Sequence, residues 1–318
     1  MKLSVVTTLY CSEKYIQEFI ERTVKVVFPV YGDDFEIIIV NDGSPDGSLS
    51  IVKELIEESR VAIKLIDLSR NFGHHKAIMS GLAHANGEMI FLIDSDLEEQ
   101  PEWFATFNDK IEACPVDVVY GVQTKRKGGF FERLTGFIFY RLFRFFTQLP
   151  QPDNIVTARL MTKRYVQALL LHEEAELNIG GLFLLTGFSQ VFLTVEKLST
   201  SQTSYSMRKR ITSLVNAITS FSNFPLIFIF YSGLAIACSA VMFIAYILGQ
   251  YFLVSEPPSG YTSVIASIWL FSGLIIFFMG ILGIYLSKIF LEVKRRPRSI
   301  IRQIYESKAK LTEFENGK

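Results

Sequence analysis

The sequence predicts an α/β domain built on a parallel β-sheet, followed by two transmembrane helices. Three observations support this prediction. Short apolar runs alternate with helical patterns in the first part of the chain, and several of these runs end in acidic or polar residues. Further on, the stretches Pro225–Leu248 and Val264–Leu286 contain 24 and 23 residues without a charge. Each is long enough to cross a hydrocarbon core of about 30 Å.

The soluble part opens with a predicted strand at Leu3–Leu9 and a helix at Glu13–Val27. The second strand, Phe35–Val40, is almost wholly apolar, as expected of a parallel strand that is covered on both faces. The next predicted elements are a helix at Leu49–Ser59, a strand at Ala62–Asp67, a helix at Lys76–Ala85, a strand leading to Asp94, a helix from Pro101 and a strand at Asp117–Gly121. Strands and helices that alternate with short connections favour a parallel sheet with right-handed crossovers.

The strand that leads to Asp94 ends abruptly in the acidic stretch Asp94-Ser95-Asp96. Because side chains alternate along an extended backbone, the Asp94 and Asp96 carboxylates are expected on the same side. Two such carboxylates form a hard oxygen site that suits Mg²⁺ or Mn²⁺ holding a diphosphate. A simpler interpretation is that they cap the helix that opens at Pro101.

Polar residues are predicted to converge at one edge of the sheet, where ligands bind beyond the carboxyl ends of parallel strands. The four strand ends fall near Thr7–Tyr10, Asp42, Asp67–Arg70 and Asp94–Asp96. The sequence has no Gly-x-Gly-x-x-Gly after the first strand and no Gly-Lys-Ser/Thr loop. This favours a nucleotide-sugar site over a nucleotide-hydrolysis site. With 32 basic and 32 acidic residues, no global field recruits a nucleic acid.

The basic residues around the two apolar stretches predict how the chain crosses the membrane. Arg208, Lys209 and Arg210 precede the pair, and a second basic group follows it, whereas the connection between the two stretches has no Lys or Arg. By the positive-inside rule, both termini and the α/β domain lie in the cytoplasm. We expect transmembrane helices at 224–249 and 264–288, an external loop at 250–263 and a cytoplasmic tail at 289–318, helical or frayed from Ile300 onwards.

Two further segments are predicted to lie at the membrane interface. In 207–223, apolar residues recur at helical spacing, so that a helix can lie flat on the bilayer. In a helix at about 132–148, Arg133, Arg141 and Arg144 fall within roughly a quarter-turn, taking about 100° per residue. A lipid-facing helix explains this stripe better than a buried core helix, which stays the alternative.

Several motifs then occur in one order along most of the chain: Val40–Ser48, Leu68–His74, Asp94–Glu98 with Pro101 and Glu102, Val118–Val122, Arg159–Met161 and Ile218–Ser222. Together they resemble the family-2 inverting glycosyltransferases of GT-A fold, a Rossmann-like fold of nucleotide-diphospho-sugar transferases. More narrowly, the chain is similar to the polyprenyl-phosphate glycosyltransferases, relatives of dolichyl-phosphate mannose synthase and of bacterial undecaprenyl-phosphate glucosyl and sugar transferases. The resemblance implies a cytoplasmic catalytic domain at 1–206.

The resemblance also implies a donor site. The nucleotide sugar is expected to bind Thr7, Tyr10, Asp42, Arg70, Asn71 and Asp94. Asp42 would hydrogen-bond the base, although it could instead be an ordinary turn residue. Asp96, helped by Glu98, would hold Mg²⁺ or Mn²⁺. The family usually has Gln in place of Glu98, which leaves the ligand set open. For His74 and His75 we expect a structural or helix-capping role.

The acceptor site is predicted from a basic cluster between the acidic stretch and the membrane. Lys125, Arg126, Arg133 and Arg159 are expected to bind an acceptor phosphate, with Arg126 and Arg133 acting in catalysis beside Asp94 and Asp96. Arg suits this role because it binds oxyanions in a fork. Contact with anionic lipid headgroups alone is the alternative. A polyprenyl phosphate keeps its tail in lipid and offers only its head, which explains an enzyme held against the bilayer.

Three residues depart from the family pattern. Many relatives have Asp in place of Thr157, and others have Gly and Lys in place of Ser201 and Ser204. A lipid phosphate has a second pKa near 6 and carries anionic oxygen at neutral pH, so it needs no general base. A hydroxyl acceptor needs one. The best remaining acids are Glu173, Glu174 and Glu176.

These observations lead to one expected function and two alternatives. We expect a multi-pass enzyme of a bacterial cytoplasmic membrane that moves one sugar from a UDP- or GDP-sugar to a polyprenyl phosphate, as a possible homo-oligomer. The first alternative is a transferase that acts on a lipid or glycan hydroxyl. The second is a catalytically weakened scaffold that binds a lipid-linked sugar.

Overall fold

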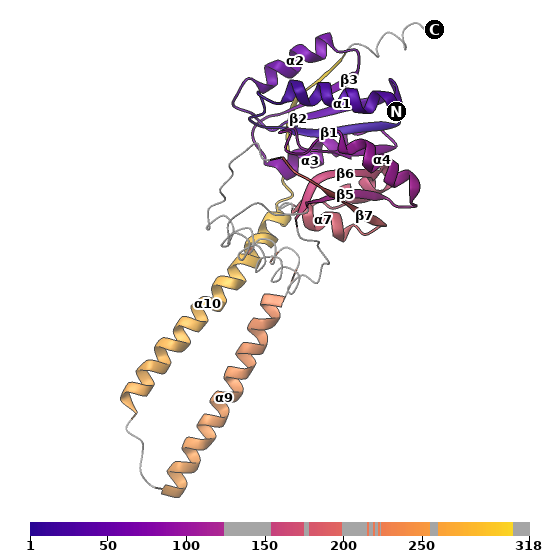
Figure 1. Ribbon diagram of the computed structural model, residues 1–318. Helices are drawn as coiled ribbons and strands as arrows, with labels where there is room; N and C mark the ends of the chain where they lie inside the picture. Colours follow the sequence, from indigo (N-terminus) through magenta and orange to yellow (C-terminus); the bar gives the residue numbers. More distant parts are fainter. Residues whose placement is uncertain are drawn as a thin grey trace.

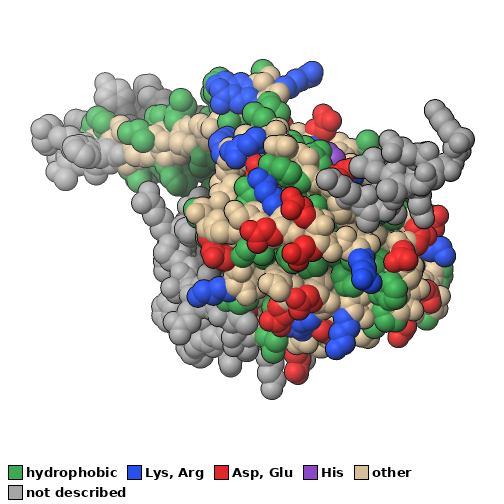
Figure 2. Space-filling view, turned by 90° about the horizontal axis from the view of Figure 1, so that it is seen from above, with side chains coloured by type: hydrophobic (Ala, Val, Ile, Leu, Met, Phe, Trp, Pro, Cys, Tyr) green, Lys and Arg blue, Asp and Glu red, His purple; other side chains and the backbone are tan. Residues whose placement is uncertain are grey.

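The computed structural model describes residues 1–123, 154–174, 178–198, 215, 219, 222, 224–254 and 260–307. Within these residues, an α/β domain carries two long helices that project away from it (Figure 1). The domain is built on one eight-stranded sheet with the order β7-β5-β6-β4-β1-β2-β3-β8. On the face seen in Figure 2, the described acidic and basic side chains are mixed over the domain.

The first half of the domain follows the predicted alternation. The strands are β1 (Leu3–Leu9), β2 (Phe35–Asn41), β3 (Ala62–Leu68) and β4 (Met89–Leu92), and the helices are α1 (Ile16–Tyr31), α2 (Ser48–Glu58), α3 (His74–Ala83) and α4 (Trp103–Ala113). These four strands pair in parallel, with β1 between β2 and β4. Their carboxyl ends therefore meet at one edge, as predicted.

The core lies in two layers, one on each face of the sheet. On one face, Val5 and Ile37 pack with buried side chains from α1, α2 and α4. On the other face, Val6 and Ile38 pack with α3 and with two helices from later in the chain. Neighbouring residues of one strand thus serve opposite cores, because side chains alternate along a strand. This explains why β2 reads as a continuous apolar run.

The second half of the domain corrects the prediction of a wholly parallel sheet. The elements there are β5 (Val118–Gln123), β6 (Ile155–Thr162), α6 (Lys163–Leu170), α7 (Ile179–Leu185) and β7 (Gln190–Val195). Strand β6 lies between β4 and β5 and runs antiparallel to both. The sheet is therefore mixed. The prediction ended at β5, because β6 comes after a long connection and its pairing cannot be seen in local periodicity.

The two projecting helices are α9 (Phe224–Val254) and α10 (Tyr261–Val293). Among the described residues, one stretch, Leu270–Val293, is long and apolar enough to span a membrane, and none of it is buried inside the protein. In α9 the corresponding apolar stretch is shorter, Phe224–Ile236. The predicted pair of transmembrane helices therefore remains a proposal.

Both predicted interfacial helices fall largely outside the described residues. This applies to all of 132–148 and to 207–223 apart from Val215, Thr219 and Ser222. The prediction of a helical or frayed tail from Ile300 onwards was wrong for Ile301–Glu306, which forms strand β8. It pairs antiparallel with β3 and closes that edge of the sheet (Figure 1). Edge pairing satisfies backbone groups of β3 that would otherwise face solvent.

Candidate active site

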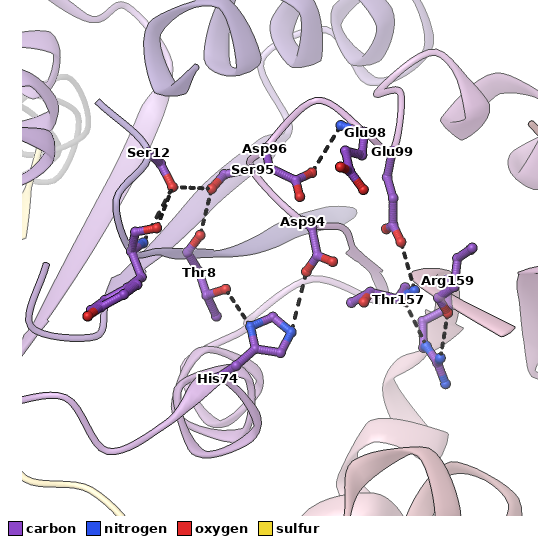
Figure 3. A network of polar contacts seen from close by, with 12 residues as sticks. Thr8, Ser12, His74, Asp94, Ser95, Asp96, Glu98, Glu99, Thr157 and Arg159 are labelled. Carbon is purple, nitrogen blue, oxygen red and sulfur yellow. Dashed lines mark hydrogen bonds and ion pairs between the residues drawn. The ribbon is translucent and has the colours of Figure 1, made fainter. Parts of the chain in front are cut away.

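The site is built where the carboxyl ends of β1 and β4 meet (Figure 3). Asp94 follows β4, and Ser95 donates a hydrogen bond to the Thr8 carbonyl at the end of β1 at 2.7 Å. The Ser95 hydroxyl also lies 3.1 Å from that of Ser12, in the loop after β1. These buried contacts fix the start of the acidic stretch against β1. The Asp94 carboxylate is thereby held at the sheet edge.

Asp42 joins the loops that follow β2 and β3 through hydrogen bonds. Its two carboxylate oxygens accept hydrogen bonds from the backbone N–H of Phe72 at 2.7 Å and of Gly73 at 3.0 Å. Burial raises the pKa of Asp42, although these two bonds act in the opposite direction. Gly43 has φ +64°, and a Cβ there would lie 2.6 Å from the Asn71 nitrogen. Only glycine allows this approach. Asp42 therefore joins the two loops from a position that is 3% exposed.

The other predicted donor residues differ in their access to a ligand. Arg70 and Asn71 are exposed, and the Arg70 guanidinium lies 4.1 Å from the centre of the Phe72 ring. Tyr10 directly follows β1 and is 51% exposed. Thr7 is fully buried within β1. Thus Arg70, Asn71 and Tyr10 present side chains that a nucleotide can reach, whereas Thr7 supports the strand.

His74 lies at the site, where its contacts fit the predicted structural role and not the predicted capping role. Its Nδ1 lies 3.1 Å from the Thr8 hydroxyl and its Nε2 lies 3.5 Å from Asp94 Oδ1 (Figure 3). The first turn of α3 has no side-chain cap. The available signal was position, since His74 directly follows a loop that ends at the same sheet edge as Asp94.

The acidic stretch forms a cluster of carboxylates. Asp96 accepts a hydrogen bond from the Glu98 backbone N–H at 3.0 Å, and burial followed by the charge of Asp94 raises the pKa of Asp96. The Lys197 ammonium lies 3.4 Å from Glu98 Oε2 and 3.6 Å from Glu99 Oε1. The helix-cap interpretation of Asp94 and Asp96 was wrong, because α4 begins at Trp103 without a side-chain cap.

The donor set of this cluster fits a hard divalent cation. No group of three or more His, Cys, Asp or Glu side chains within the described part of the chain is arranged as a complete metal site. Mg²⁺ is usually held by one or two carboxylates, with substrate phosphates and water as the other ligands. Asp94 and Asp96 meet that requirement, and a cation would relieve their mutual repulsion. Glu98, the second predicted ligand, pairs with Lys197.

A pocket of about 220 Å³ adjoins the cluster, lined by Glu99, Gln123, Asn154, Ile155, Val156, Thr157 and Lys197. The Thr157 backbone N–H donates to Glu99 Oε1 at 2.9 Å. Glu99 is fully buried, and its Oε2 has no hydrogen-bond partner among the residues that the structure describes. Burial followed by the charge of Asp94 raises the pKa of Glu99 to about 8. Sequence reasoning missed Glu99 and Lys197. A carboxyl group thus stands next to Thr157, where many relatives have Asp.

Arg159, predicted to bind the acceptor phosphate, is enclosed by the protein. Its guanidinium donates to the Thr157 and Val156 carbonyls and lies 3.3 Å from the centre of the Phe183 ring. The residue is 3% exposed, and burial lowers its pKa to about 10. Arg159 lies in the middle of the sheet because β6 is a central strand. It supports the strand that carries Thr157 and is not exposed to a ligand.

The remaining acceptor predictions fall outside the described residues. This applies to Lys125, Arg126 and Arg133, to the departures Ser201 and Ser204, and to Glu176. The acids Glu173 and Glu174 follow α6, at a distance in the chain from the cluster, and Glu173 is exposed. The acid that the structure places near Asp94 is Glu99, which was not among the acids predicted for base catalysis.

The sequence matches the family "Glycosyl transferase family 2" over residues 4–170. A Mycobacterium tuberculosis protein named as a glycosyltransferase is 45% identical over 307 residues, which cover 96% of this chain and 89% of that protein. The Bacillus subtilis glycosyltransferase YkcC is 32% identical over 96% of this chain and 94% of its own length. The chain belongs to glycosyl transferase family 2. This family-2 transferase is also 29% identical, over 96% of its length and 99% of the other, to an Escherichia coli prophage bactoprenol glucosyl transferase homologue.

Family membership identifies the chain as a glycosyltransferase with the mixed α/β sheet of the GT-A type. The family match ends at the last residue of α6, so it includes β1 to β6 and the whole acidic stretch. Lys197 lies beyond it. The family-2 core of this transferase is thus completed by a lysine from the segment that follows β7.

In this family-2 transferase, Lys197→Met is expected to lower the free energy of unfolding by about 3 kcal/mol at pH 9, above the Glu99 pKa of about 8, because an ionised Glu99 would then be buried near Asp94 without its cation. Thermal unfolding of the full-length protein in detergent measures this loss of stability. Adding Glu99→Gln removes the stranded charge and should recover most of it. Lys64→Met is the matched control, since its partner Glu306 is 60% exposed and such pairs contribute about 0–1 kcal/mol. Equal losses for the two lysines would contradict this account.

Proposed function

We propose that this transferase moves one sugar from a nucleoside diphosphate sugar to a polyprenyl phosphate and inverts the anomeric centre by in-line displacement. The observation that carries the proposal is the carboxylate cluster at the sheet edge, next to loops that are locked by Asp42. The cluster supplies the cation site for a diphosphate, the loop after β3 supplies an exposed arginine for a nucleotide, and the segment after β1 supplies an exposed tyrosine. Asp94 and Asp96 are the protein ligands in this proposal.

The donor is recognised at two places. Arg70, Asn71 and Tyr10 present accessible side chains to the nucleotide, while Asp42 holds the loop that carries Arg70 and Asn71. Mg²⁺ or Mn²⁺, when bound, neutralises charge on the departing nucleoside diphosphate. His74 orients Asp94 through its Nε2 and is itself oriented by Thr8. A UDP- or GDP-sugar fits this arrangement.

The acceptor is inferred from chemistry and from the relatives. The name of the E. coli homologue refers to bactoprenol, a polyprenyl lipid, and to glucosyl transfer. A phosphate head already carries nucleophilic oxygen at neutral pH. The stretch Leu270–Val293 would keep the catalytic domain at a membrane surface, where the head of such a lipid lies. Arg126 and Arg133, with Lys125, remain the proposed phosphate contacts.

The proposed arrangement in the membrane follows the sequence prediction. Two transmembrane helices, at 224–249 and 264–288, anchor a cytoplasmic catalytic domain to a bacterial cytoplasmic membrane. An interfacial helix at about 132–148 and another at 207–223 bring the acceptor side of the domain against lipid. A homo-oligomer is compatible with this arrangement.

A hydroxyl acceptor is the second candidate, and Glu99 favours it. A hydroxyl needs a general base, and Glu99 is a buried carboxyl group in the pocket beside Thr157 with one oxygen that has no hydrogen-bond partner. Its pKa of about 8 suits proton transfer near neutral pH. This candidate predicts a sugar on an alcohol rather than on a phosphate.

Membranes that contain the full-length chain, incubated with a panel of labelled nucleotide sugars and undecaprenyl phosphate, test the proposal. A labelled product that extracts into chloroform supports it. Tight binding of the lipid without product supports the alternative of a scaffold that binds a lipid-linked sugar. A labelled product that stays in the aqueous phase excludes a polyprenyl acceptor.

Removing divalent cations is expected to abolish transfer, since Asp94 and Asp96 alone leave the diphosphate charge without a counter-ion. After treatment with a chelator, activity should fall by at least about 100-fold and return on addition of Mg²⁺ or Mn²⁺. Initial rates with a labelled donor measure the change. Full activity in excess chelator would argue against the cation site.

A further inference from the structure

Strand β8 brings an arginine from beyond the second long helix to the donor side of the domain. Arg302 Nη1 lies 3.3 Å from Asp67 Oδ2, and its Nη2 donates to the Ser69 carbonyl at 2.7 Å. Both partners belong to the end of β3 and the loop after it. One guanidinium therefore bridges the last part of the strand and the loop that presents Arg70 and Asn71.

Asp67 connects Arg302 to the loop that follows β2. It is 1% exposed, and its second oxygen, Oδ1, accepts a hydrogen bond from Asn41 Nδ2 at 2.7 Å. Asn41 Oδ1 in turn accepts from the Ser44 backbone N–H at 3.0 Å. A continuous chain of bonds thus runs from Arg302 to the loop after β2, which also contains Asp42.

The two loops joined in this way are the proposed donor loops, and their contact is close. A Cβ at Gly43 would lie 2.7 Å from the Arg70 carbonyl carbon, so a small shift of either loop would disturb the other. A buried carboxylate such as Asp67 needs a cation or several hydrogen bonds to stay in place. Among the described residues, the ion pair of Asp67 is with Arg302.

Strand β8 has other anchors that do not depend on Arg302. The Ser307 hydroxyl accepts from the Ile63 N–H at 3.2 Å and donates to the Val61 carbonyl at 3.2 Å. Ser69 N–H donates to the Ile300 carbonyl at 2.8 Å. Lys64 pairs with Glu306 at 3.2 Å. A change at Arg302 therefore alters the donor loops while the strand keeps its other anchors to β3.

We propose that Arg302 is a positioning residue for the nucleotide sugar. It fixes the two donor loops through Asp67 and the Ser69 carbonyl, so that the segment returning from α10 completes the donor site. This inference rests on the proposed function, because it assumes that a nucleoside diphosphate binds at these loops. It also means that donor affinity depends on a strand that follows the membrane-length helix.

The test uses the full-length protein in detergent and measures binding of UDP and, separately, GDP in the presence of Mg²⁺. Arg302→Gln is expected to weaken binding of the preferred nucleotide by about 10-fold or more, the effect of a lost charged hydrogen bond. Arg302→Lys should recover part of the loss, because an ammonium can reach one of the two oxygens. Glu306→Gln, on the same strand, is the matched control and should bind like the wild type.

Kinetics separate positioning from folding. Arg302→Gln should raise the KM for the nucleotide sugar and leave the KM for the lipid acceptor unchanged. The double variant Asp67→Asn with Arg302→Gln should bind the nucleotide better than Arg302→Gln alone, because no charge is left buried. Unchanged affinity in Arg302→Gln, or an equal loss in Glu306→Gln, would overturn the inference alone. Failure of the wild type to bind either nucleotide would overturn the proposed function and this inference together.

Discussion

Asp96→Asn should reduce sugar transfer by about 10²–10³-fold while the α/β domain stays folded. Asp96 is half-buried near Asp94, and desolvation together with the charge of Asp94 raises its pKa, so the native state does not depend on its ionised form. Asn removes this repulsion and is expected to leave thermal stability unchanged or higher. The same change removes a cation ligand, which lowers the rate. Initial rates with labelled donor and thermal unfolding of the same preparation measure the two effects.

Glu98→Gln is the matched control for Asp96→Asn. It removes one negative charge from the same stretch, at a side chain that pairs with Lys197. The resemblance to the family indicates that Gln serves at this position. Transfer should therefore stay within a few-fold of the wild type. If Asp96→Asn keeps wild-type turnover, or if Glu98→Gln loses as much, Asp96 is not the main cation ligand.

Gly43→Ala is expected to raise the KM for the donor by at least about 10-fold and to lower the free energy of unfolding by about 3 kcal/mol. Two costs combine at this position. The backbone has φ +64°, which disfavours any residue with a Cβ, and the new methyl group would lie 2.6 Å from the Asn71 nitrogen. The loop that carries Arg70 and Asn71 must move away. Steady-state kinetics with varied donor and thermal unfolding measure both effects.

Gly32→Ala separates the two costs. Gly32 ends α1 with φ +56°, and no heavy atom lies within 4 Å of a Cβ built there. The substitution should therefore cost about 1–2 kcal/mol of stability from the backbone alone. Donor KM should remain that of the wild type. A similar rise in donor KM for both glycine variants would show that general destabilisation, rather than loop contact, controls the donor site.

Local patterns predicted the first half of the fold well. Strand β1 has its predicted bounds, Leu3–Leu9. Strands β2 and β3 each extend one residue beyond the predicted C-terminal end. These strands are largely buried on both faces, so that their apolar composition is enough to predict them. Strand β6 contains the charged Arg159, and β8 is rich in exposed polar residues. Their places in the sheet depend on partners far away in sequence, which periodicity does not reveal.

The sequence likewise predicted some residues of the candidate site and not others. Asp94 and Asp96 follow an apolar strand, so their position at the sheet edge could be inferred. His74 offered a weaker signal of the same kind, because it follows a loop that ends at this edge. Glu99 and Lys197 gave none, because their roles arise from burial and from an ion pair between segments that are distant in sequence. Arg159 was predicted to bind the acceptor phosphate. In the structure its guanidinium is buried and donates to carbonyl groups of β6, so that it supports this strand.

The central claim is that this family-2 transferase places a sugar on a lipid phosphate. The most direct test supplies the purified full-length enzyme, Mg²⁺ and a labelled nucleotide sugar with either a polyprenyl phosphate or the corresponding polyprenol. Transfer to a lipid phosphate should give a labelled lipid with the phosphate and none with the alcohol, and Asp96→Asn should lose that product. A labelled lipid from the polyprenol, or equal products from both lipids, would contradict this claim.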